Sequence, residues 1–261
     1  MNYKMLCNYS SNLGSLYPKL CGNPLVAGQY SIPLSVLANY FPSESLSRQK
    51  VLDWGCGGGH FSYLLMEMGF DVYGYSYCLS DALYIMKEVL FKKFHREWHA
   101  VQSDCTDPVA LPYPDAHFET AFSLGVLEHV RENQGGDEVS SLRELYRILK
   151  PGGHLFVFHF PNKHSWIEKC VRILNKMRIV TAYSHSFLYT QQTIEHLVGQ
   201  TNFSLLEMGM YNLFPRRMLR WVPRGIANKK CVFTGVCFAE RFVERWLRKF
   251  SQNYYFVLKK L

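Results

Sequence analysis

One stretch of the chain combines residue types that could bind a nucleoside-type cofactor. Residues 51–54 are suited to a buried strand, and Gly55, Gly57 and Gly59 follow. Glycine lets the backbone turn tightly and approach a ligand, and the N–H groups that open a helix attract negative groups. Asp53 adds a carboxylate at the strand end, which suits a cofactor with an amino group. Because an ordinary strand–helix turn and an NAD-binding turn share this pattern, the downstream residues must decide.

Strands and helices that alternate along the chain position this glycine turn. The first strand–helix unit covers residues 51–68, and Lys150-Pro151-Gly152-Gly153 ends a later helix before a strand. Apolar periodicity predicts the remaining elements. They are strands over 71–75, 99–102, 120–124, 154–160, 204–210 and 254–258, and helices over 33–40, 81–94, 140–149 and 191–200.

Several of these segments together resemble the class I S-adenosylmethionine-dependent methyltransferases. The matching segments, in order, are Asp53-x-Gly55-x-Gly57-x-Gly59, Leu111 to Glu119, Leu127-Glu128-His129 and Arg147-x-Leu149-Lys150-Pro151-Gly152-Gly153. The resemblance covers roughly residues 50–162 and is to the small-molecule type, similar to enzymes that methylate quinones, lipids and glycan intermediates. It implies an α/β fold with a Rossmann-like seven-stranded sheet, mostly parallel with an antiparallel final strand, and helices on both faces.

The resemblance also implies which residues bind S-adenosylmethionine. It assigns Asp104 to the adenine amino group, Cys105 to the adenine ring and Leu124 to the pocket wall. The full predicted set is Asp53, Gly55, Cys56, Gly57, Ser76, Tyr77, Asp104, Cys105 and Leu124.

Ser76 departs from the family pattern, which has an acid at this position for the ribose hydroxyls. A neutral hydrogen bond in place of a charged one loses about 1–2 kcal/mol. Three interpretations remain open: weaker cofactor binding, a contribution from Asp71 or Asp81, or a relative that has lost catalysis.

His129 is the predicted catalytic base, because methyl transfer to an oxygen is aided by a base that titrates near neutral pH. Glu128 is predicted to orient His129 or to hold a substrate group. The alternative is that His129 only caps the following helix. His159, His164 and His185 are reserve candidates. No metal site is predicted. Some relatives that methylate quinone-ring hydroxyls hold a divalent ion with acids in this neighbourhood; Glu128, Glu132, Asp137 and Glu138 could do so here, but no spacing demands it.

Three regions lie outside the matching segments. Residues 1–49 are predicted to be an irregular N-terminal cap with one helix, and 50–261 the methyltransferase domain. Within that domain, we expect a substrate-recognition insert at about 161–189 and a basic loop at about 214–230. The later apolar stripe is predicted to be core, and its members are Phe238, Phe242, Val243, Trp246, Leu247 and Phe250.

Composition limits the location and the partners. The net charge is +8, and the positive charge is concentrated after Lys163. The eight cysteines show no CxxC pair, which favours free thiols in a reducing cytoplasm. The segment 214–224 mixes Arg with Met, Leu and Trp, so it suits either peripheral contact with the inner membrane surface or a solvated loop. The chain lacks the signature of an RNA-binding sheet, so we do not expect a nucleic-acid partner.

Together these features predict methyl transfer from S-adenosylmethionine to a small or lipid-linked acceptor, through O-methylation. Two alternatives stay open. One is a methyltransferase-like scaffold without catalysis, which Ser76 suggests. The other is an RNA methyltransferase, which the basic charge suggests.

Overall fold

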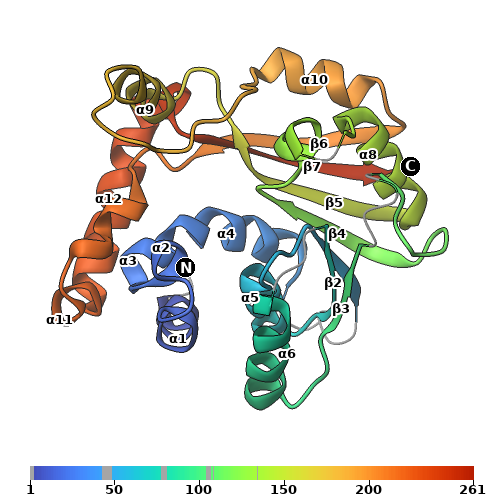
Figure 1. Ribbon diagram of the computed structural model, residues 1–261, viewed down its shortest axis with the longest axis horizontal. Coiled ribbons are helices and arrows are strands. Elements are labelled where there is room, and N and C mark those ends of the chain that lie inside the picture. The colour runs from blue at the N-terminus through green and yellow to red at the C-terminus, as the bar shows by residue number, and fades with distance from the viewer. Residues whose placement is uncertain (1–2, 43–48, 78–80, 104–106, 108, 134) are drawn as a thin grey trace. The chain divides into compact units, whose positions relative to one another are not determined.

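The chain forms two compact units, each built from segments that are far apart in the sequence (Figure 1). The computed structural model describes residues 3–42, 49–77, 81–103, 107, 109–133 and 135–261. The sheet unit contains the described residues of 46–161, 186–209 and 254–261, and the helical unit contains those of 1–45, 162–185 and 210–253. Within the described residues, no helix combines the length and the apolar composition that spanning a bilayer requires.

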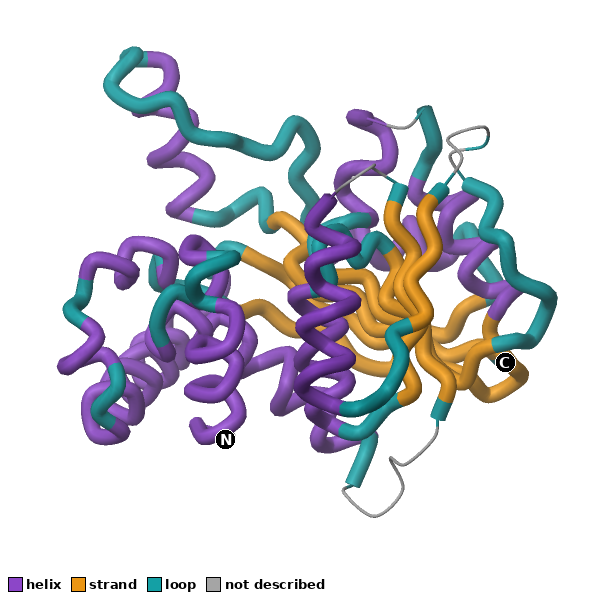
Figure 2. Tube along the Cα trace, turned by 60° about the horizontal axis from the view of Figure 1, so that its bottom comes forward, coloured by secondary structure: helices purple, strands orange, loops and turns teal. Residues whose placement is uncertain are grey.

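A seven-stranded sheet has the order β3-β2-β1-β4-β5-β7-β6, and Figure 2 shows its strands as one continuous layer. The strands are β1 (Lys50–Trp54), β2 (Asp71–Ser76), β3 (His99–Gln102), β4 (Phe118–Leu124), β5 (Leu149–Pro161), β6 (Phe203–Tyr211) and β7 (Asn253–Lys260). β1 to β5 pair in parallel. β7 runs the other way, since Lys260 at its end bonds the carbonyl of Leu149, where β5 begins. The predicted Rossmann-like fold is confirmed.

The central strands are buried on both faces, and aromatic packing covers one of those faces. Phe122 of β4 stacks on Phe156 of β5 with ring centroids 5.4 Å apart, and Phe61 meets the Phe122 ring edge-on at 6.0 Å. Parallel strands that are covered on both sides carry nearly continuous apolar runs. This packing fixes the carboxyl ends of β1 and β4, where the glycine turn and the Leu-Glu-His segment begin.

The described helices of the sheet unit are the four that were predicted and two short ones that follow β4. They are α5 (His60–Met68), α6 (Asp81–Phe94), η2 (Leu127–His129), α7 (Val130–Asn133), α8 (Glu138–Ile148) and α10 (Gln191–Gly199). Asp137 caps α8 by accepting a hydrogen bond from the Ser140 amide at 2.9 Å. Thr190 caps α10 through its side chain.

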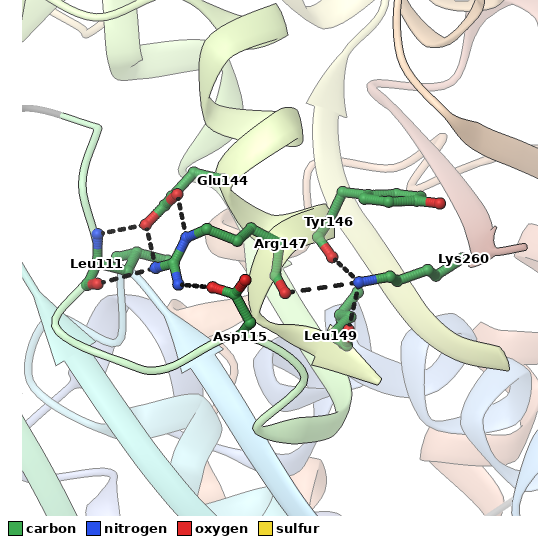
Figure 3. Close-up of polar contacts among 7 residues, drawn as sticks. All are labelled: Leu111, Asp115, Glu144, Tyr146, Arg147, Leu149 and Lys260. Carbon is green, nitrogen blue, oxygen red and sulfur yellow. Dashed lines mark hydrogen bonds and ion pairs between the residues drawn. The ribbon is translucent and has the colours of Figure 1, made fainter. Parts of the chain in front are cut away.

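A polar cluster joins α8 to the loop that leads into β4 (Figure 3). The guanidinium of Arg147 donates to the Glu144 carboxylate at 2.7 Å and 2.8 Å, and to Asp115 at 2.6 Å. It also reaches the carbonyl of Leu111 at 3.2 Å. Beside it, Lys260 donates to the carbonyls of Tyr146 and Leu149, each at 2.7 Å. These bonds hold the amino ends of β4 and β5 together, on the side of the sheet opposite the glycine turn.

The N-terminal region is helical, so the prediction of irregular structure before residue 33 was wrong. The helices are α1 (Tyr3–Leu13), α2 (Pro18–Cys21), α3 (Pro24–Ala27), η1 (Gly28–Tyr30) and α4 (Ser31–Tyr40). In α1, the side chains of Leu6, Tyr9 and Leu13 are fully buried at helical spacing. The Ser and Asn residues between these positions made the segment look irregular, so its helical spacing was not recognised from the sequence.

The rest of the helical unit contains α9 (Trp166–Lys176), η3 (Arg216–Trp221), α11 (Arg224–Ala227), α12 (Lys230–Leu247) and η4 (Arg248–Phe250). Two of these helices, η3 and α11, lie in the stretch expected as a basic loop. The prediction that the apolar stripe of α12 is core was also wrong, because most of it is exposed. The buried side of α12 instead carries Phe233, Cys237 and Glu240. Spacing identified a helical stripe but could not tell which side of the helix packs inward.

Candidate functional site

Three glycines shape the turn between β1 and α5. Gly55, Gly57 and Gly59 have φ of +73°, +51° and +75°, a backbone region that side chains disfavour. A Cβ on Gly55 would lie 2.3 Å from a methyl carbon of Val126. At Gly57, by contrast, no described atom lies within 4 Å of where a Cβ would be. The turn therefore packs tightly against the end of β4 at Gly55 and leaves space beside Gly57.

Asp53 is a buried carboxyl just before this turn. Its side chain is 1% exposed and accepts a hydrogen bond from the Ser62 hydroxyl at 2.6 Å. Burial raises the pKa of Asp53 to about 7, and the bonds from Ser62 offset only part of that shift. Cys56, in the turn itself, is also buried, which raises the pKa of its thiol. A positively charged ligand group beside Asp53 would favour the ionised carboxylate.

The end of β2 lies beside the turn. The amides of Gly55 and Cys56 donate to the carbonyl of Tyr75 at 2.8 Å and 2.9 Å. Ser76 comes next, is buried, and accepts a backbone hydrogen bond from Ser103 at 2.8 Å. Tyr77 follows and is half-buried. The predicted adenine-binding residues Asp104 and Cys105 lie outside the described residues.

Of the two acids suggested as replacements at the Ser76 position, the structure rules out Asp71. Asp71 begins β2 and Ser76 ends it. At about 3.3 Å per residue, the two lie roughly 16 Å apart along the strand. Asp81 is exposed at the start of α6.

The end of β4 carries the predicted catalytic pair. Leu124 is half-buried, and Gly125 has φ +70° and donates to the carbonyl of Phe158 at 3.1 Å. Glu128 is 2% exposed, and burial raises its pKa to about 8. Its Oε2 has no hydrogen-bond partner among the described residues. A buried carboxyl of this kind at a strand's carboxyl end is typical of a functional site.

Glu132, rather than Glu128, is the carboxylate that holds His129. Nδ1 of His129 lies 2.9 Å from Oε2 of Glu132, whereas its Nε2 lies 3.8 Å from Oε1 of Glu128. The other oxygen of Glu132 accepts from the Ser186 amide at 2.9 Å. Sequence reasoning assigned no such role to Glu132. The signal that could have found it is the three-residue separation, which places both side chains on one helical face.

Two of the other nearby acids already have partners of their own. Glu138 is buried and binds both Arg131 and the hydroxyl of Tyr189, and Asp137 caps α8. The Tyr189 ring also packs on Phe160 with centroids 4.1 Å apart. These contacts brace the turn that carries His129.

The reserve histidines fall in different places. His159 belongs to β5, has φ +63°, and places its Cβ 3.9 Å from where a Cβ of Gly125 would be. His164 and His185 belong to the helical unit. There His185 bonds Glu168 at 2.9 Å.

Comparison with known protein families identifies the family of the chain. A family model described as "Methyltransferase domain" matches residues 30–208, which is most of the chain. The chain belongs to the S-adenosylmethionine-dependent methyltransferase family. Its cofactor is S-adenosylmethionine.

Individual relatives of this methyltransferase are distant. A ubiquinone biosynthesis O-methyltransferase of Proteus mirabilis is 28% identical over 61% of the chain and 63% of its own length. The corresponding protein of Pseudomonas entomophila is 31% identical over 43% of the chain and 44% of its own length. A tRNA U34 carboxymethyltransferase of Nautilia profundicola is 28% identical over 44% of the chain and 36% of its own length. The chain thus spans less than two thirds of the length of these relatives.

Solved structures agree on the fold. A SAM-dependent methyltransferase of Archaeoglobus fulgidus superposes with a TM-score of 0.54 at 17% identity, covering 88% of this chain and 94% of that one. The [4+2]-cyclase SpnF gives a TM-score of 0.53 at 19% identity, covering 87% of this chain and 78% of that one. Identity this low shows the shared fold alone, and the fold carries more than one chemistry.

The residues described fit the methyltransferase cofactor at one end and depart from the family at the other. Asp53 is a buried carboxyl whose raised pKa the cofactor's amino group would lower, and the open space at Gly57 lets a ligand approach the backbone. Ser76 stands where the family has an acid for the ribose hydroxyls. We therefore assign Asp53, Gly55, Cys56 and Gly57 to the amino-acid end, and Ser76 and Tyr77 to the ribose, as proposals.

Proposed function

We propose that this methyltransferase transfers a methyl group from S-adenosylmethionine to a hydroxyl on a small or lipid-linked acceptor. The observation that carries the proposal is the His129–Glu132 pair beside buried Glu128, at the carboxyl end of β4. Ligands of open α/β sheets bind at this end of the strands. The names of the two ubiquinone O-methyltransferases support an oxygen acceptor.

His129 acts as the general base in this mechanism. With Glu132 accepting from Nδ1–H at 2.9 Å, the tautomer of His129 leaves Nε2 unprotonated and able to take the hydroxyl proton of the acceptor. The imidazolium that forms is stabilised by Glu132. When bound, S-adenosylmethionine supplies an electrophilic methyl group on a sulfonium.

Glu128 has a second role in this mechanism. Burial raises its pKa to about 8, so it holds its proton near neutral pH and can donate a hydrogen bond. Its Oε2 has no partner among the described residues, so we propose that it binds a polar group of the acceptor. Oε1, 3.8 Å from Nε2 of His129, faces the imidazole.

The test is a methyl-transfer assay with S-adenosylmethionine labelled in its methyl group. The acceptors are a catechol, a prenylated hydroxyquinol and a prenyl-linked sugar, together with calorimetry of the demethylated cofactor product. We expect cofactor binding at micromolar concentration and labelled methyl ether on at least one hydroxyl acceptor. Binding of the product without transfer to any hydroxyl would reject O-methylation and retain the cofactor site.

Two other functions have a specific observation behind them. A scaffold without catalysis is favoured by Ser76. It predicts no thermal shift with the cofactor or its product. An RNA methyltransferase is favoured by the tRNA-modifying relative. It predicts RNA binding that weakens steeply as salt rises.

We propose that residues 214–224 make a peripheral contact with the inner surface of the membrane. Trp221 is 78% exposed and Met218 is 68% exposed, and the guanidinium of Arg220 lies 4.8 Å from the Trp221 ring centroid. Arg216 does not take part, because it is buried and paired with Glu240. A buried charge needs such a partner, and the sequence pattern alone did not separate Arg216 from its exposed neighbours.

A further inference from the structure

The outer side of α12 carries an apolar stripe that no described residue of its own unit covers. Phe238, Phe242 and Trp246 repeat every four residues and are 70%, 62% and 76% exposed. Phe242 follows the fully buried Phe233 by nine residues, which is two and a half helical turns. The stripe therefore lies diametrically opposite the packed side of α12, the long helix that follows α11 in Figure 1.

The charges around the stripe are of one sign. Arg241, Arg245, Arg248 and Lys249 are all exposed. Residues 210–253 contain two carboxylates, Glu240 and Glu244, and both belong to the inner side of α12. Glu240 pairs with buried Arg216 and Glu244 accepts from the Leu213 amide at 3.4 Å. Exposed basic residues thus flank the stripe without exposed acids among them.

We propose that the outer side of α12 docks on an anionic lipid surface. Phe238, Phe242 and Trp246 would lie at the headgroup level, where aromatic side chains are favoured, with the basic residues on lipid phosphates. α12 has 18 residues and is therefore about 27 Å long, enough for a helix lying flat in the interface.

The charges around the stripe distinguish a lipid surface from a second copy of the chain. A second copy of the chain would bring Arg241, Arg245 and their equivalents toward one another, and like charges oppose that contact. An RNA partner would be held by the basic residues, and its unpaired bases could stack on the aromatic rings, so tRNA binding is an outcome that the test below distinguishes. A lipid surface satisfies the charges and the stripe together.

This inference extends the membrane contact proposed for residues 214–224 and does not depend on methyl transfer. The test is flotation of the full chain with vesicles of phosphatidylcholine, alone or with about 30% phosphatidylglycerol. We expect flotation with the anionic vesicles only. Phe242→Ser with Trp246→Ser should weaken vesicle partitioning roughly tenfold for each side chain, and Arg245→Gln about fivefold.

Matched controls keep the result specific. Phe91→Ser replaces an aromatic side chain that is 59% exposed on α6 and should leave flotation unchanged. The double variant should bind the demethylated cofactor product as the native chain does, so a failure here is distinguishable from a failure of the proposed function. Quenching of Trp emission by brominated lipid should decrease in Trp246→Phe, which retains flotation.

Three results would overturn the proposal. The first is no flotation with anionic vesicles. The second is a stable dimer that the double variant converts to monomer while flotation stays unchanged, which would assign the stripe to a second copy. The third is tRNA binding that Arg245→Gln weakens in a chain that does not float, which would assign the basic residues to RNA.

Discussion

The two ends of the parallel strands treat charge in opposite ways. At the amino ends of β4 and β5, Arg147 is bonded to Glu144, Asp115 and a carbonyl, and Lys260 donates to several carbonyls. At the carboxyl ends of β1 and β4, Asp53 and Glu128 are buried with raised pKa values. At the amino ends, the charged groups have partners within the protein. At the carboxyl ends, the buried carboxyls have hydrogen-bond partners among the described residues for only some of their oxygens.

This difference separates stability from function. A buried polar group without enough partners destabilises a fold. The amino-end cluster avoids that penalty, and it pins α8 and β7 in place (Figure 3). Asp53 and Glu128, at the carboxyl ends, are buried with too few partners among the described residues and so destabilise the fold. Because the turn beside them is open at Gly57, we expect a ligand to supply the missing partners.

The largest effect is expected from breaking the catalytic pair. His129→Ala removes the base, and a base contributes about 10²–10⁴ in rate. Glu132→Gln should lower kcat less, about tenfold, since it removes only the orientation and stabilisation of the imidazole. Labelled-methyl assays over a range of pH check both variants. Unchanged kcat in His129→Ala, with cofactor binding intact, would mean that the histidine only packs beside the pocket.

The pH dependence of stability is the next largest effect. The pKa of Asp53 is raised to about 7 and that of Glu128 to about 8, so the folded chain binds more protons than the unfolded chain between about pH 4 and pH 8. The free energy of unfolding should therefore fall as pH rises through that window, by about 4 kcal/mol for each carboxyl. Urea unfolding at several pH values measures the slope.

Two substitutions sharpen that measurement in opposite directions. Glu128→Gln removes one of the two titrating groups and should flatten the slope. Ser62→Ala removes a hydroxyl that lowers the pKa of Asp53 and should steepen it. If neither variant changed the slope of the free energy of unfolding against pH, the raised pKa values of Asp53 and Glu128 would not be the cause of that slope.

A smaller effect is expected at the amino ends. Arg147→Ala removes bonds to two carboxylates and one carbonyl, and should lower the free energy of unfolding by about 1–2 kcal/mol. Because the cluster lies across the sheet from the glycine turn, binding of the demethylated cofactor product should stay as in the native chain. Calorimetry and urea unfolding of the same variant test both statements. If Arg147→Ala lost cofactor binding but kept native stability, the cluster at the amino ends would be part of the cofactor site, and this prediction would be wrong.

The sequence predicted the sheet well, because its signals are local. The strand over 99–102 and the helix over 81–94 match β3 and α6. The glycine turn was also predicted from the sequence, because Gly55, Gly57 and Gly59 all have positive φ, a backbone conformation that favours glycine. By contrast, the side on which α12 packs depends on the distant residue Arg216, whose charge Glu240 on the inner side compensates. Glu132 was missed for a similar reason: its role appears only when the chain after β4 becomes helical.

The smallest effect is expected at Ser76, the residue assigned to the ribose. Ser76 is buried at the end of β2, next to the turn held by Tyr75. Ser76→Asp restores the acid of the family and replaces a neutral hydrogen bond with a charged one, worth about 1–2 kcal/mol. Calorimetry should then show about tenfold tighter binding of the demethylated cofactor product.

The matched substitution Ser76→Asn controls for size without adding charge, so it should not reproduce that gain. The added carboxylate is itself buried near Asp53, and desolvation and repulsion act against it. If Ser76→Asp binds the cofactor product more weakly than Ser76→Asn, the carboxyl end already holds as many acids as its ligand can compensate. Serine at this position would then be the adaptation that lets Asp53 and Glu128 remain.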